Sequence, residues 1–63
     1  MDRAEFEFKN IKFVVKRSEA GNLIYRDRAH TFGPWSNVAK SLSNKSLDRT
    51  FRYKLKLASA AIV

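Results

Sequence analysis

Residues 51–57 have the sequence FRYKLKL, and the conformation of this stretch decides the fold. Apolar and basic side chains alternate strictly along it, which is typical of a β-strand with one face buried. A second pattern overlaps the first, because apolar residues at helical spacing also run through the segment (Leu47, Phe51, Leu55, Ala58 and Ile62). The strict alternation and the aromatic start lead us to prefer the strand.

A strand over 51–57 predicts a row of cations. Arg52, Lys54 and Lys56 then project from one face, about 6.6–6.8 Å apart, since each strand residue advances 3.3–3.4 Å. This spacing is close to that of successive phosphates along a nucleic-acid strand. The simpler alternative is that a two-layer sheet needs one polar face, and that Lys and Arg discourage aggregation of sheet edges.

The N-terminal half predicts a β-hairpin. Residues 5–16 are rich in Phe, Val and Ile, and their alternation changes phase near Lys9 and Asn10. Either a bulge or a turn between two short strands explains that change. The polar segment 18–22 predicts a hairpin loop, and 23–27 a further strand. Residues 28–32 are expected to leave the sheet.

The segment 33–37 predicts the start of a short helix. Pro34 suits a first helical turn, Ser36 is an alternative N-cap, and Asn44 is a candidate left-handed stop. Trp35, Leu42 and either Val38 or Ala39 then share one face. The expected fold class is α+β with the order ββαβ, a three-stranded antiparallel sheet with one short helix packed on a face.

Length and composition bound the protein further. The 63 residues make one small basic domain, residues 1–63. There is no cysteine and one histidine, so disulfides and a metal site built on thiolates are excluded, and we expect no cofactor. Thirteen Lys and Arg against six Asp and Glu give a net charge of +7. From Thr31 onward six basic residues face one acid, Asp48, which favours a polyanionic or acidic partner.

Catalysis is not expected. Asp27, His30, Ser36 and Ser41 can be drawn as a triad, but there is no nucleophile elbow and no glycine-rich oxyanion turn. The two glycines lie twelve residues apart and fit neither phosphate-binding motif. The sequence therefore indicates a non-enzymatic protein with no small-molecule substrate.

The candidate binding residues are basic side chains on or near the last two predicted strands. They contact either nucleic acid or an acidic protein surface: Arg52, Lys54, Lys56, Lys45, Arg49, Arg26 and Arg28. The aromatic residues Trp35, Tyr25 and Tyr53 are expected in the core or sheet, although an exposed Trp35 could stack a base.

The apolar residues Ile62 and Val63 at the C-terminal end either extend the last strand or contact a partner, so a monomer and a homodimer both remain open. The N-terminal residues lack the apolar core of a signal peptide, and no apolar run approaches the roughly 20 residues that span a bilayer. We expect a cytoplasmic protein without membrane partners. A membrane-surface role would require the last segment to be a basic amphipathic helix.

The middle and end of the chain resemble small accessory proteins of tailed bacteriophages, through residues 35–42 (WSNVAKSL) and then 52–55 (RYKL). The resemblance covers about half of the chain and departs at residues 37–39, where the family often has Gly-Ala-Ala. It implies a β-hairpin, a short helix opened by an aromatic residue, a closing strand, and a protein that binds a host or phage macromolecule in the host cytoplasm.

Two functions follow as hypotheses. The first is binding to nucleic acid through the basic strand, largely independent of sequence. The second is a protein-binding modulator or inhibitor that docks on an acidic surface of a host enzyme of transcription or nucleic-acid processing.

Overall fold

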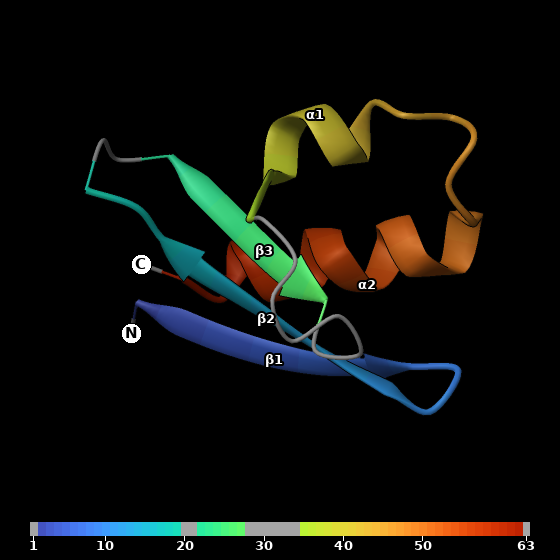
Figure 1. Ribbon diagram of the computed structural model, residues 1–63, viewed down its shortest axis with the longest axis horizontal. Coiled ribbons are helices and arrows are strands. Elements are labelled where there is room, and N and C mark those ends of the chain that lie inside the picture. Colours follow the sequence, from blue (N-terminus) through green and yellow to red (C-terminus); the bar gives the residue numbers. More distant parts are fainter. Residues whose placement is uncertain (1, 20–21, 28–34, 63) are drawn as a thin grey trace.

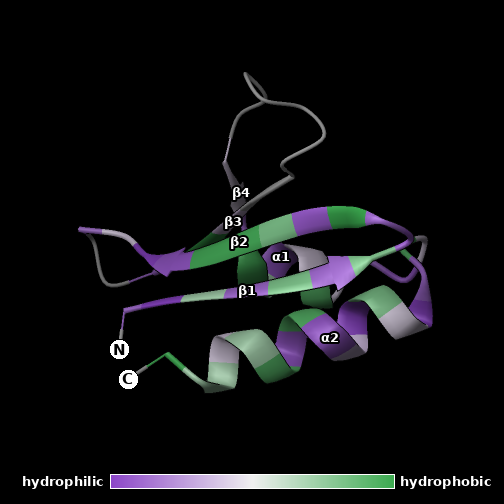
Figure 2. Cartoon of the chain, turned by 90° about the horizontal axis from the view of Figure 1, so that it is seen from below, coloured by the Kyte–Doolittle hydropathy of each residue, from purple (hydrophilic) through white to green (hydrophobic). Residues whose placement is uncertain are grey.

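The computed structural model describes residues 2–19, 22–27 and 35–62, and for residues 26 and 27 the backbone alone. An antiparallel sheet in the order β1-β2-β3-β4 forms one layer, and two helices cover one of its faces (Figure 1). Figure 2 shows α2 beneath the strands. The elements are β1 (Arg3–Phe8), β2 (Ile11–Arg17), β3 (Leu23–Asp27), β4 (Ser36–Asn37), α1 (Val38–Leu42) and α2 (Arg49–Ala60). The expected α+β class is confirmed, but the order is ββββαα rather than ββαβ.

The preference for a strand at 51–57 is wrong, because this stretch lies within α2. The helix begins after Asp48, whose carboxylate accepts hydrogen bonds from the backbone N–H groups of Thr50 (2.7 Å) and Phe51 (3.3 Å). Phe51, Leu55 and Ala58 are buried along its inner side. The helical pattern prevails because it continues for four turns, whereas the alternation ends after seven residues.

The change of phase near Lys9 is a turn rather than a bulge. Lys9 and Asn10 join β1 to β2 with φ angles of 51° and 66°, as the two central residues of a type I′ hairpin turn require. The register pairs Phe8 with Ile11 and Phe6 with Phe13. The turn therefore places the apolar side chains of both strands on one face of the sheet.

Glycine and alanine at position 10 should differ in their effect on stability. In a left-handed backbone the Cβ atom of an alanine clashes with the main chain, whereas a glycine has no Cβ and adopts this conformation without strain. We expect Asn10→Gly to exceed Asn10→Ala by about 1 kcal/mol in the free energy of unfolding. Urea unfolding followed by the fluorescence of Trp35, the single tryptophan, measures this difference. Equal stabilities of the two variants would contradict the turn.

The second hairpin matches the expectation in the residues that the structure describes. The strand predicted at 23–27 is β3, and it pairs with β2. The N–H of Ser18 donates to the carbonyl oxygen of Asn22 at 2.7 Å, which closes the loop at its base. Residues 28–32, predicted to leave the sheet, lie outside the described residues.

The short helix α1 is present but begins later than predicted. Asn37 is its N-cap, and its side chain accepts a hydrogen bond from the N–H of Lys40 at 3.1 Å. Ser36, the predicted cap, lies in β4 opposite Tyr25. Asn44 is not a left-handed stop, since Lys9 and Asn10 are the non-glycine residues with positive φ in the described part of the chain. The helix ends instead at the C-cap Ser43. Pro34 lies outside the described residues.

The core lies between the sheet and the two helices. Leu55 and Val15 are fully buried, and an aromatic cluster surrounds Phe51. The centre of the Phe51 ring lies 4.9 Å from the centre of the Phe13 ring and 5.6 Å from that of the Phe6 ring, in tilted or edge-to-face arrangements. The core thus fixes α2 against β1 and β2 and determines which side of the helix faces solvent.

Within the described ranges, no helix has the length and apolar character needed to cross a bilayer.

Candidate binding surface on helix α2

The helix layer carries an uncompensated excess of positive charge. Of residues 35–62, six are Lys or Arg and one is acidic, Asp48. The Asp48 carboxylate is committed to the N-cap of α2, and α2 itself contains no acidic residue. The basic residues are distributed over α1, the connecting turn and α2: Lys40, Lys45, Arg49, Arg52, Lys54 and Lys56.

The row of three cations predicted on a strand does not exist. On α2, Arg49, Arg52 and Lys56 follow one another at intervals of three and four residues and share one side of the helix. We call these three residues the α2 stripe. Lys54 instead reaches the edge of the sheet, where its Nζ donates to the carbonyl oxygen of Glu7 at 2.8 Å. The same Nζ lies 5.9 Å from the centre of the Phe8 ring.

The α2 stripe has no ion-pair partner among the described residues. Arg49 and Lys56 are exposed, and Arg52 is half-buried with its Nε enclosed and without a hydrogen-bond partner in the described part of the chain. The ion pairs of that part join Glu5 to Arg3 and Lys12 instead. Phosphate or carboxylate groups of a ligand would therefore not compete with internal partners for the stripe.

On the opposite face of the sheet, by comparison, acidic side chains partly balance the positive charges. Glu5 lies 2.7 Å from a guanidinium nitrogen of Arg3 and 3.6 Å from the Nζ of Lys12. Desolvation raises the pKa of Glu5, but the hydrogen bond and charge of Arg3, and then Lys12, outweigh it and leave the pKa lowered. The sheet face thus presents neighbouring charges of both signs, which weakens its field.

Two large apolar side chains are exposed next to the α2 stripe. Tyr53 is 62% exposed and Leu57 53% exposed. They lie four residues apart, so they are neighbours on the helix surface. The prediction that Tyr53 is a core or sheet residue is wrong, whereas Tyr25 is half-buried against the core as expected. A helical wheel of α2 identifies both exposed side chains, but the strand interpretation conceals them.

Trp35 is half-buried, and the Nζ of Lys16 lies 4.9 Å from its ring centre. Ile62 is 7% exposed and packs in the core of this chain. The side chain of Arg26 and residues Arg28, His30 and Val63 lie outside what the structure describes.

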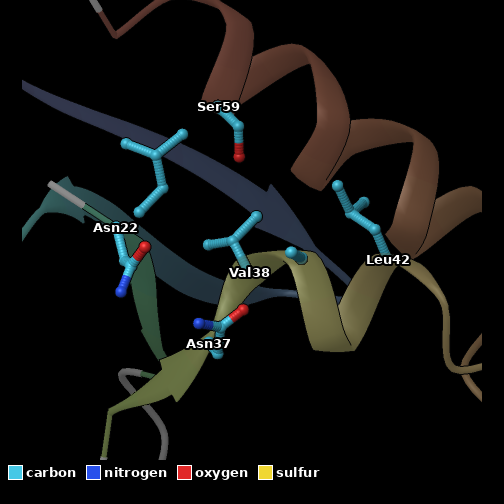
Figure 3. A pocket seen from close by; sticks show the side chains of 7 residues that line it. Asn22, Asn37, Val38, Leu42 and Ser59 are labelled. Carbon is cyan, nitrogen blue, oxygen red and sulfur yellow. The ribbon is translucent and has the colours of Figure 1, made fainter.

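A shallow depression of about 270 Å³ separates α1 from the last turn of α2 (Figure 3). Val38 and Leu42 of α1 line it together with Ser59 of α2, and Asn22 and Asn37 lie at its border. All of its lining side chains are uncharged. The depression therefore does not belong to the cationic surface. The described residues also contain no cluster of three metal-binding side chains.

No family model matches the chain, and no curated protein or solved structure matches it either.

Proposed function

We propose that this protein is a non-enzymatic nucleic-acid-binding protein that contacts the phosphate backbone through the α2 stripe. The observation that supports this most is the absence of acidic residues on α2, together with three cations on one side of it. A polyanion gains most from such a surface, because each neutralised phosphate releases condensed counterions.

The geometry of the stripe suits this role. Arg49 and Lys56 are separated by about 10 Å along the helix axis, since each residue advances 1.5 Å, so the stripe can contact more than one phosphate. Lys45, in the exposed turn before α2, extends the positive surface along the same layer. Contacts of this kind position a protein on nucleic acid without reading its sequence.

The proposal predicts binding that weakens steeply with salt. We expect a labelled single-stranded oligonucleotide to bind at low salt, and three phosphate contacts to lower its affinity roughly 20-fold between 50 and 200 mM salt. Fluorescence anisotropy measures both values, and heparin as a competitor should displace the oligonucleotide. Absence of binding at 50 mM salt would refute the proposal.

An acidic protein surface is a second candidate partner, favoured by the exposed apolar pair Tyr53 and Leu57. Aromatic and Arg residues commonly anchor protein interfaces. This candidate corresponds to a modulator or inhibitor of a host enzyme that processes nucleic acid. A labelled polyglutamate peptide distinguishes the two: its binding, with no binding of oligonucleotides at low salt, favours an acidic protein.

We also propose the biological context that the sequence resemblance implies, an accessory protein of a tailed bacteriophage acting in the host cytoplasm. Its support is the sequence of residues 35–42, in which α1 begins at Val38, after β4, rather than at the aromatic residue Trp35. Residues 52–55 support it less, since they lie in α2 and not in the closing strand that the resemblance implies.

A further inference from the structure

Tyr53 lies on the outward side of α2, close to the cations. Phe51, Leu55 and Ala58 face the core, so a residue two positions after Phe51 is turned about 200° away from it. Tyr53 is 62% exposed, and its ring stacks on no other ring among the described residues. Its neighbours one helical turn away are Arg49 and Thr50 on one side, and Lys56 and Leu57 on the other.

We propose that Tyr53 stacks on an unpaired base, so that the ligand of the α2 surface is single-stranded nucleic acid. This inference rests on the proposed function and adds its ligand class. An exposed aromatic ring between cations is the arrangement with which proteins hold single strands, because bases stack on the ring while phosphates contact the cations. Leu57, beside the ring, extends the apolar surface that a base or sugar can cover.

A duplex offers the Tyr53 ring far fewer base faces on which to stack. In a duplex each base face is already stacked on its neighbours, so Tyr53 could contact only groove edges or sugars. The cations would bind the phosphates of either form. The proposal therefore places the preference for single strands on Tyr53 and the salt dependence on the α2 stripe.

An abasic strand separates the two contributions, because it keeps the phosphates and lacks the bases. We use anisotropy with labelled oligothymidine of about ten nucleotides, an abasic strand of equal length and a duplex of equal length. The wild-type protein should bind oligothymidine roughly ten-fold more tightly than the abasic strand. Tyr53→Ala should remove this preference, and Tyr53→Phe should retain it.

The control variant is Thr50→Ala, which changes another exposed residue of α2 and should retain the preference. Far-UV circular dichroism and Trp35 fluorescence verify that each variant is folded. Equal affinities of the wild-type protein for oligothymidine and the abasic strand would overturn this inference and leave the proposed function standing. A higher affinity of the wild-type protein for the duplex than for oligothymidine would also overturn it. Absence of binding to all three probes would overturn both proposals.

Discussion

Replacing Leu55 with alanine should leave most of the protein unfolded at room temperature. Leu55 is fully buried between α2 and the sheet. Truncating a buried leucine costs about 2–5 kcal/mol, through lost burial and the cavity left behind. A domain of this size has a free energy of unfolding on the order of a few kcal/mol, so the loss is comparable to the whole stability.

Leu57→Ala is the matched control, because it removes the same atoms from the same helix at a position that is 53% exposed. Its free energy of unfolding should change by less than about 0.5 kcal/mol. Far-UV circular dichroism and urea unfolding compare the two variants. Similar losses in both would mean that α2 does not pack on the sheet through its Leu55 side.

Reversing two charges of the α2 stripe should weaken nucleic-acid binding by roughly 100-fold at low salt. The variant Arg49→Glu/Lys56→Glu removes two phosphate contacts and adds two repulsions. Both residues are exposed, and a glutamate at Arg49 lies in the first turn of α2, where the helix dipole favours negative charge. The variant should therefore fold, and anisotropy with the single-stranded oligonucleotide measures its affinity.

A second reversal controls for net charge. Lys9→Glu/Arg17→Glu lowers the net charge from +7 by the same four units, but Lys9 lies in the turn between β1 and β2 and Arg17 is the last residue of β2, so neither is on α2. We expect this variant to lose less than about ten-fold in affinity, through the long-range field alone. Equal losses in both variants would show that the total charge, and not the α2 stripe, determines binding.

The elements predicted correctly are those specified by neighbouring residues. The polar segment 18–22 and the strand 23–27 follow from local signals, and the structure has a hairpin closure and β3 there. The hairpin turn at Lys9 and Asn10 was one of two alternatives, because neither residue is the glycine that usually marks a type I′ turn.

The last segment could not be assigned by pattern alone. Phe51 and Leu55 satisfy both the strand and the helix, whereas Tyr53 and Leu57 satisfy the strand only. The helix forms because it buries Phe51, Leu55 and Ala58 against a sheet that is already assembled from other strands, and Ile62, just after the helix, joins the same core. Tyr53 and Leu57 are exposed as a result. The side chains that made the sequence misleading are therefore those that we propose for ligand binding.

The residues that we propose for binding were chosen from composition, which does not give their arrangement. Composition identified the basic second half, and Arg49, Arg52 and Lys56 lie together on α2. Lys54 does not share their side of the helix, and its Nζ donates to the carbonyl of Glu7, which is 47 positions away in the sequence. No local signal in the sequence indicates such a pairing.

The separation of charge between the two layers has a kinetic consequence. Residues 2–27 carry six basic and five acidic side chains, whereas residues 35–62 carry six and one. The described part of the molecule therefore has an electric dipole moment with its positive end at the helices. In the field of a polyanion it experiences a torque that turns α2 toward the ligand before contact, which increases the fraction of productive encounters. Because added salt screens this field within about 10 Å at 0.1 M, the orientation is lost at high ionic strength and association slows.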